Sequence, residues 1–417
     1  MEGENIFWYG LKSDVYVHIC KDKALVYDTN QKKCRVCEDK HVINLLGKIE
    51  EEESLGFVLI DEVKQLPSVL KWIQLTCKED MAIRLPYYKE VERPVILRPL
   101  LSLNKDVCKI KDEKFMPFYC GTNVKHLLNS LTIYVNANCK LNCKKCGSYC
   151  SQIPFCSNCE IENGTSLSAS QWNSLLLDLS TFPIRSINIF GGDVYDKMIL
   201  EVLKNAVERY SFCFRIYIHY EAYQENDFVD SQVVHLLIPA GFDAKYLKDV
   251  YKRVDNSRAV LHFVVETEED VQSVDNFVCK NNVVSYLIHP YYTGSNRTFF
   301  EENVYMSEED LINVKLSMRE IFRNQKLNAN NFGTLYILPN GRITARMEGP
   351  TLGHVGHDEL IDVIYKELVS NTAWRKIREG KPCSQCVFQY LCPPPSNYES
   401  LIGKNDLCYM RNNKISV

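Results

Sequence analysis

The 417-residue chain lacks the features that mark several classes of protein. It has no run of about eighteen apolar residues, which a membrane-spanning helix requires. Its first residues are acidic and no apolar stretch follows them, so we expect no secretory signal. The formal net charge is −4, and no long basic run is present, which argues against nucleic acid as a partner. We therefore expect a cytoplasmic protein that binds neither a membrane nor nucleic acid.

Cysteine, by contrast, is abundant, with 18 residues in the chain. Disulfides of a secreted protein would explain this number, but the export signal is missing. Clustered cysteines in a reducing compartment favour metal or iron–sulfur ligation instead. The clusters are therefore the first place to look for function.

The first hundred residues have the pattern of a separate module. The hydrophobic share of 46% and the charged share of 24% indicate an ordinary globular protein, long enough for two or three domains. Short alternating runs predict strands, and amphipathic stretches predict helices. We interpret residues 1–95 as a winged-helix-like module, whose last residues overlap an expected linker at Arg84–Pro99. The expected strands are Val15–Cys20, Ala24–Asp28, Lys33–Val36 and Phe57–Ile60, and the expected helices are Val42–Ile49 and Pro67–Leu75.

Residues 125–325 alternate apolar, β-branched runs with helical patterns. Such strands joined by helical crossovers predict a parallel sheet covered on both faces, in an α/β fold. Six βα units predict a partial (β/α)6 barrel whose site lies at the carboxyl ends of the strands. The expected strands are Leu131–Val135, Ser186–Phe190, Phe214–His219, Val233–Ile238, Ala259–Val265 and Val284–His289. The expected helices are Ser170–Leu179, Lys197–Tyr210, Asp243–Val254, Glu268–Lys280 and Ser307–Arg323, with Ser170 and Ser307 as N-caps and Asp310 completing a capping box.

Residues 328–417 have a different character. Two short apolar runs, Leu335–Leu338 and Arg342–Ala345, flank a Pro-Asn-Gly turn and predict a hairpin. A helix is expected at Glu359–Val369, and a cysteine-rich, loop-rich tail follows. We expect this range to be a small domain ordered by a metal centre.

Three cysteines follow directly on the first expected strand of the central region. Cys139, Cys143 and Cys146 can hold three irons of a [4Fe–4S] cluster and leave the fourth iron open to a small chelating molecule. Zinc is the alternative, because two C-x2-C pairs with a further cysteine between them can also form a four-thiolate site. Both interpretations stay open. The zinc interpretation adds Cys150, Cys156 and Cys159.

Gly191, Gly192 and Asp193 end the second expected strand of the same region. Two glycines at such a strand end let the backbone approach a ligand closely, and Asp193 can accept a hydrogen bond from an ammonium group. A plain turn gives the same pattern. The position one strand after the cysteine loop is what makes these residues candidates for cofactor binding.

A second cysteine set lies in the tail, at Cys383, Cys386, Cys392 and Cys408. Four thiolates in a loop-rich segment with little core of its own predict a metal centre that orders it. Zinc and [4Fe–4S] both fit this spacing.

Two further groups of residues are weaker candidates. His289 and Arg297 follow the sixth expected strand at the same edge, where Arg297 can hold a carboxylate, although a solvated loop explains them equally well. His354 and His357 have ligand-like spacing, but turn residues after the hairpin are the simpler interpretation.

Taken together, these residues resemble radical S-adenosylmethionine (SAM) enzymes with a C-terminal SPASM domain, which modify ribosomally made peptides. The three-cysteine loop, the Gly-Gly-acid turn and the six βα units match the radical SAM core, and Cys383 to Cys408 match the latter half of a SPASM domain. Residues 1–95 resemble the winged-helix leader-peptide recognition module often fused to such maturases. Residues 294–300 and 391–399 resemble the pseudo-radical-SAM SPASM proteins of Bacteroidales peptide-modification clusters. Three features depart from the family pattern: Lys145 replaces an aromatic residue, Asp193 replaces glutamate, and no further cysteines flank the hairpin.

The resemblance implies a maturase that binds SAM and a [4Fe–4S] cluster and abstracts hydrogen from a side chain of a precursor peptide. An auxiliary [4Fe–4S] cluster or zinc would occupy the tail cysteines. The alternative is a catalytically degenerate scaffold that binds the precursor peptide for a partner maturase, with zinc or a structural cluster on its cysteines. Whether the protein is an enzyme therefore stays open, with catalysis favoured by the three retained loop cysteines. A zinc hydrolase is a weaker third hypothesis, because the chain lacks an H-E-x-x-H motif.

Overall fold

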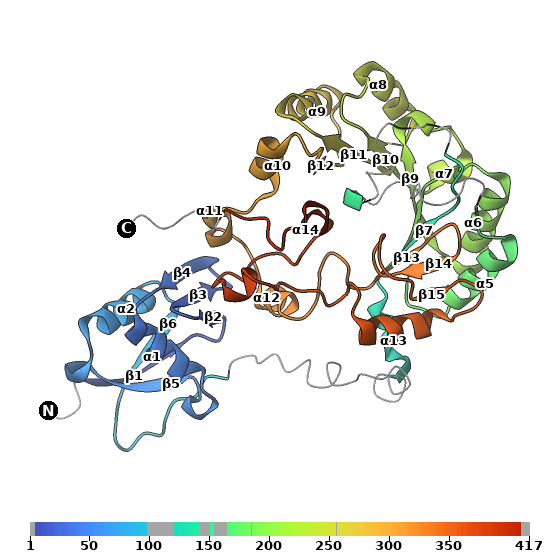
Figure 1. Ribbon diagram of the computed structural model, residues 1–417. Helices are drawn as coiled ribbons and strands as arrows, with labels where there is room; N and C mark the ends of the chain where they lie inside the picture. The colour runs from blue at the N-terminus through green and yellow to red at the C-terminus, as the bar shows by residue number, and fades with distance from the viewer. Residues whose placement is uncertain are drawn as a thin grey trace.

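The computed structural model of the chain describes residues 5–97, 121–139, 141, 143, 151–153, 165–184, 186–255 and 257–409. Figure 1 shows a small N-terminal unit beside a large sheet with helices around its outer side. No helix within these described ranges is long and apolar enough to cross a membrane. The mixed α/β class is confirmed, whereas a barrel-like closure, a winged helix and a SPASM domain stay predictions.

The N-terminal unit contains two three-stranded antiparallel sheets and two helices. One sheet has the order β5-β1-β6 and the other the order β2-β3-β4. The predicted meander is confirmed, but β1 was not predicted, and β6 occupies the start of the expected linker. The elements are β1 (Ile6–Leu11), β2 (Val15–Cys20), β3 (Lys23–Asp28), β4 (Lys33–Cys37), α1 (Lys40–Glu50), β5 (Phe57–Asp61), α2 (Pro67–Lys78) and β6 (Ala82–Pro86).

The large sheet has nine strands in the order β12-β11-β10-β9-β8-β7-β13-β14-β15. Strands β7 to β12 are parallel, which confirms the six predicted βα strands. They alternate between an outer face, packed on helices by residues such as Ile187 and Leu236, and an inner face. Their bounds are β7 (Ser130–Tyr134), β8 (Ser186–Phe190), β9 (Cys213–His219), β10 (Val233–Ile238), β11 (Ala259–Val265) and β12 (Tyr286–Pro290).

The helices of this region differ from the predictions in two places. The N-cap of α5 is Ser168 rather than Ser170, because the Ser168 hydroxyl pairs with Gln171 in a capping box. The single helix predicted at 307–323 is two short helices, because Ser317 starts a second capping box with Glu320. The predicted box of Ser307 with Asp310 is confirmed. The helices are α5 (Ala169–Leu179), α6 (Lys197–Tyr210), α7 (Asp227–Ser231), α8 (Ala244–Arg253), α9 (Glu268–Asn281), α10 (Arg297–Val304), α11 (Glu308–Ile312) and α12 (Met318–Asn324).

The predicted hairpin after residue 328 extends the large sheet rather than standing apart from it. Strand β13 pairs in parallel with β7 and antiparallel with β14, so the hairpin joins the sheet beside the strand that leads to the cysteine loop. Helix α13 packs Leu360, Ile364 and Leu368 into the same core. The elements are β13 (Thr334–Ile337), β14 (Arg342–Thr344), β15 (Gly353–His354), α13 (Leu360–Ser370) and α14 (Asn397–Ile402).

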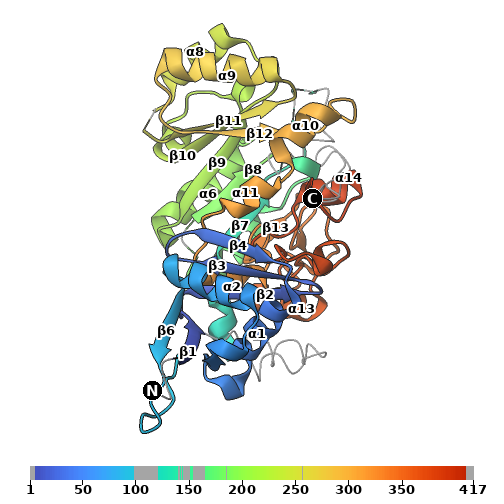
Figure 2. The same cartoon turned by 90° about the vertical axis from the view of Figure 1, so that its left-hand side faces the viewer.

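The N-terminal unit packs against the end of the chain. Tyr27 of β3 and Phe388 of the tail are buried in one apolar cluster together with Leu311 of α11. Hydrogen bonds reinforce this contact: His18 Nδ1 lies 2.8 Å from the Val387 carbonyl oxygen. Figure 2 shows the blue strands of the unit beside α11 and the red tail. Segments more than 280 residues apart in sequence therefore share one core.

Candidate metal and ligand sites

The carboxyl ends of β7 and β8 are tied together by one side chain. Asn136, two residues after the end of β7, accepts a hydrogen bond from the Asp193 amide (2.8 Å) and donates one to the Asp193 carbonyl (3.0 Å). Its Oδ1 also accepts from the Asn138 amide (3.0 Å), so the same residue shapes the start of the cysteine loop. The two segments predicted to hold the cluster and its ligand therefore meet at one edge of the sheet.

The glycine turn after β8 is fitted to the protein itself. Gly192 has φ +61°, and a Cβ there would lie 1.9 Å from Asn136 Oδ1 and 2.3 Å from its carbonyl oxygen. Only glycine fits this contact. One Asp193 carboxylate oxygen accepts a hydrogen bond from the Tyr195 amide (3.0 Å). We expected the missing side chain of Gly192 to leave room for a ligand. In the structure, Asn136 occupies that space.

The cysteine loop is only partly within the described residues. Cys139 is exposed and Cys143 is partly exposed. Cys146 and the zinc candidates Cys150, Cys156 and Cys159 lie outside the described residues. Within the described ranges, no three His, Cys, Asp or Glu side chains are arranged as they would be around a metal ion. The predicted ligand sets therefore stay predictions.

Residues 151–153, which follow this loop, are hydrogen-bonded to the segment after β12, several strands away from β7. Gln152 donates to the Tyr292 carbonyl and accepts from the Tyr292 amide, both at 2.8 Å. Ile153 is buried with Leu237 and Val264 of the inner face. Residues 151–153 thus lie against the inner face beside β12, as the short segment in the middle of Figure 1 shows.

The four tail cysteines line a single cavity of about 500 Å³. Strands β3 and β4 contribute one wall through Lys23 and Val36, and helix α11 contributes Leu311. Burial raises the pKa of the thiol of Cys392 to about 12 and also raises that of Cys386, while nearby thiols add to both effects. All four thiols line this cavity, but no three of them are arranged as they would be around a metal ion, so zinc or an iron–sulfur cluster at this site stays a prediction.

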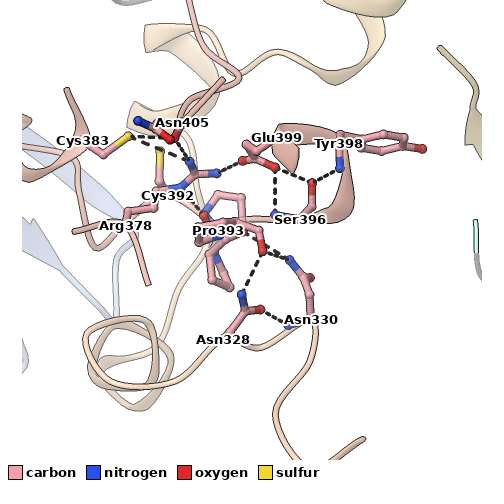
Figure 3. Close-up of polar contacts among 12 residues, drawn as sticks. Asn328, Asn330, Arg378, Cys383, Cys392, Pro393, Ser396, Tyr398, Glu399 and Asn405 are labelled. Atoms are coloured by element: carbon pink, nitrogen blue, oxygen red, sulfur yellow. Dashed lines mark hydrogen bonds and ion pairs between the residues drawn. The ribbon is translucent and has the colours of Figure 1, made fainter. Parts of the chain in front are cut away.

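A buried guanidinium organises the tail around these thiols. Arg378 forms an ion pair with Glu399 at 2.6 Å, and the two side chains are 9% and 6% exposed. Its other nitrogens donate to the carbonyls of Pro393 (2.5 Å) and Asn405 (3.4 Å), and Nη1 lies 3.9 Å from Cys383 Sγ. Figure 3 shows this hub, with Arg378 between the sulfurs and Glu399. One cation therefore links three segments of the tail and faces the predicted metal site.

The weaker candidates have local roles in the structure. Arg297 opens α10 and does hold a carboxylate, that of Glu301 at 2.7 Å in the next turn. His354 lies in β15, and its amide bonds to the Asp358 carboxylate, so the interpretation as a turn is sufficient. His289 has a different outcome, because it belongs to a buried row of histidines that sequence reasoning missed.

Two of those histidines were overlooked because each lies in a run of apolar residues. His235 and His262 occupy β10 and β11, with His289 on β12. The sequence did contain a signal for the row. Each histidine lies at a position that points to the inner face of its strand, and successive histidines are 27 residues apart in sequence.

Comparisons with known proteins identify no family for this chain. No family model and no curated protein matches it. Solved structures of Streptococcus suis SuiB align over nearly the whole length. The structure bound to S-adenosylmethionine has a TM-score of 0.44 and 12% identity, covering 96% of this chain and 97% of that one. The structure bound to the precursor peptide SuiA has a TM-score of 0.45 and 13% identity, covering 96% and 98%. With so low a sequence identity and TM-score, the chain is similar to SuiB but takes no function from it. Any function has to be argued from the residues described above.

Proposed function

We propose that the chain is a radical SAM-type maturase that acts on a ribosomally made precursor peptide by abstracting hydrogen from a side chain. The observation that carries the proposal is the Asn136 contact, which joins the start of the three-cysteine loop to the Gly-Gly-Asp turn at the carboxyl edge of a parallel sheet. Ligand sites of parallel α/β folds lie at this edge. The proposed domain roles are peptide recognition for residues 1–95, catalysis for 125–325 and a SPASM-like domain for 328–417.

In this proposal the chain's residues bind and orient the reacting groups. Cys139, Cys143 and Cys146 would hold a [4Fe–4S] cluster, which supplies the electron for SAM cleavage when bound. Backbone groups of Gly191 and Gly192 would contact the amino acid end of SAM. Asn136 would act as a positioning residue, because it fixes the distance between these two segments. The apolar cluster around Ile153 would exclude water from the inner face.

The tail cysteines would hold the auxiliary centre, an iron–sulfur cluster or zinc. Burial raises the pKa of the Cys383 thiol, and the positive charge of Arg378 beside it offsets part of that rise, which supports this role because metal binding requires the thiolate. Glu399 keeps that guanidinium in place through a charge-assisted hydrogen bond.

The precursor peptide would bind at the N-terminal unit. Strand β2 is an edge strand of its sheet, so its outer backbone groups can pair with an added strand. A cavity of about 470 Å³ lies along β2, and its lining includes Val17, Leu55 and Ile96. An extended, partly apolar peptide fits these features.

A scaffold role is the second candidate, and the glycine turn favours it. The space above Gly192 is filled by Asn136, and the Asp193 carboxylate bonds to the Tyr195 amide. A degenerate maturase that presents a precursor peptide to a partner maturase could retain this arrangement without binding SAM.

Anaerobic purification with iron, sulfide and zinc analysis, followed by an assay for 5′-deoxyadenosine, separates these candidates. The maturase is expected to carry about eight irons per chain if both sites are [4Fe–4S] clusters, and to release 5′-deoxyadenosine from SAM. Clusters without SAM cleavage would support the scaffold. Zinc without iron would rule out the proposed catalysis.

A further inference from the structure

Three histidines on consecutive strands form a hydrogen-bonded row on the inner face of the large sheet. Nδ1 of His235 lies 2.8 Å from Nε2 of His262, and Nδ1 of His262 lies 2.9 Å from Nε2 of His289. The row climbs toward the carboxyl edge, because His262 is level with Leu237 and His289 is level with Val264, each two residues beyond the previous histidine. None of the roles proposed above uses these side chains.

Protein surrounds the row, so its rings are neutral at pH 7. His235 is 9% exposed and His262 is 4% exposed. Burial lowers the pKa of His235 and of His289 to about 4, and that of His262 to about 2. The positive charge of Arg215 on β9 adds to the lowering at His235, and the neighbouring rings add to it at His262.

The apolar residues above the row keep water away from it. Leu237, Val264 and Tyr291 form a buried cluster with Ile153, from the segment that follows the cysteine loop. On the far side, the Tyr217 ring stacks on His235 with centroids 4.1 Å apart and planes at 15°. A proton entering or leaving the row therefore has to do so at its ends.

Two hydrogen bonds among three neutral imidazoles couple their protons. A neutral ring has one N–H and one lone pair, so it can donate from one nitrogen only. If His235 donates from Nδ1, then His262 and His289 must also carry their protons on Nδ1. If His289 donates from Nε2, all three carry the proton on Nε2. The row thus has two tautomeric states, and a change at one ring changes all three.

The inner end of the row is a buried nitrogen, Nε2 of His235, which has no hydrogen-bond partner among the described residues. Leaving such a group unpaired costs free energy, which a bound donor or acceptor would recover. The outer end lies at the carboxyl edge of the sheet, where His289 is followed within three residues by Tyr292, which is bonded to Gln152. The row therefore leads from a buried, unpartnered nitrogen to the predicted reaction edge.

We propose that His235, His262 and His289 form a proton relay for a weakly acidic group of a bound peptide beside His235 Nε2. His235 Nε2 takes one proton from that group, and the Nδ1 proton of His235 passes to His262 Nε2. The Nδ1 proton of His262 passes to His289 Nε2, and the Nδ1 proton of His289 leaves at the edge. One proton crosses, each ring ends neutral, and no electron moves. The peptide as proton donor rests on the proposed function.

NMR spectroscopy of the full-length chain, labelled with 15N-histidine and free of cofactor, tests the coupling directly. At pH 7 we expect all three rings to be neutral and to carry their protons on the same nitrogen. The variant His262→Gln is expected to shift the tautomer populations of both His235 and His289. The matched control His219→Gln, on the neighbouring strand β9, should shift neither. A charged ring at pH 7, or opposite tautomers within the row, would overturn the relay.

Turnover by the metal-loaded protein tests the function of the row. His262→Gln is expected to lower formation of the modified peptide by about 10²-fold, the usual contribution of a positioned proton-transfer group. Release of 5′-deoxyadenosine should not change, and added imidazole should restore product in His262→Gly. Unchanged product formation would reduce the row to a structural element. If the wild type does not cleave SAM, the proposed function fails, and the NMR result alone decides the relay.

Discussion

The two cysteine sets lie in regions that are held together by different forces. At the edge of the large sheet, neutral hydrogen bonds of Asn136 and tight backbone contacts at Gly192 join β7 to β8. In the tail, a buried ion pair between Arg378 and Glu399 joins a loop to the short helix α14, in a region with little regular structure. A sheet edge is already rigid, so short contacts suffice there. A loop-rich tail needs charge-assisted bonds and, we expect, a metal.

The largest expected effect comes from replacing one cysteine of each set and comparing the activity and stability of the two variants. Cys139→Ala should abolish release of 5′-deoxyadenosine while changing the thermal stability of the chain little, because Cys139 is exposed. Cys392→Ala should lower both metal content and melting temperature, because its thiol is buried against the tail. Measuring both variants by the SAM assay and by calorimetry checks the contrast. Equal loss of stability in the two would contradict it.

Removing the cation of the tail should come next in size. Arg378→Met leaves Glu399 buried without its charged partner, and we expect the free energy of unfolding to fall by about 3–5 kcal/mol. The double variant Arg378→Met with Glu399→Gln should recover part of this loss, since glutamine can keep the capping box with Ser396. Denaturant unfolding of the single and double variants measures the coupling, and purely additive effects would contradict it.

At the edge of the large sheet, the contact can be broken by steric overlap rather than by removing a charge. Gly192→Ala places a methyl group against Asn136 at a positive φ, and we expect a loss of about 3 kcal/mol. Gly241→Ala is the matched control, because it has a similar φ of +70° with no atom within 4 Å of the new methyl group. Its loss should be about 1 kcal/mol, from the backbone strain alone. Equal losses would show that the Asn136 contact is not tight.

Acid should affect the inner face of the large sheet through its neutral histidines. The pKa of His235 is about 4 in the folded chain and has its ordinary value of 6.5 when unfolded. The unfolded chain therefore binds a proton first as the pH falls, so stability is lost between pH 6.5 and pH 4 and is constant above that window. This residue alone contributes up to about 3 kcal/mol. In His235→Gln the pH dependence of unfolding should be shallower over this window.

The sequence pattern predicted the elements well where a mostly apolar run is bounded by polar residues. The strands 186–190, 233–238 and 259–265 match the structure in both bounds, because continuous apolar runs leave little choice of register. The strand β1 was missed, since its six residues mix aromatic and glycine positions without a clear alternation. The helix predicted at 307–323 failed at Ser317, where a local capping box outweighed the apolar pattern.

The candidate sites were predictable only in part. Cysteine spacing predicted the tail set as a metal site; its four members line one cavity, and the metal itself stays a prediction. The spacing could not reveal Arg378, because a single arginine among loop residues carries no periodic signal. The histidine row was hidden for another reason: its members are far apart in sequence, and only the strand register brings His235, His262 and His289 together.

The contact between the N-terminal unit and the tail has a consequence for synthesis of the protein on the ribosome. Tyr27 donates a hydrogen bond to the carbonyl of Val314, 287 residues later, and is buried with Phe388 of the tail. At usual rates of translation, tens of seconds separate the appearance of these partners. During that time the nascent N-terminal unit exposes an apolar surface that only the last hundred residues can cover, so it is at this stage that a chaperone would be needed.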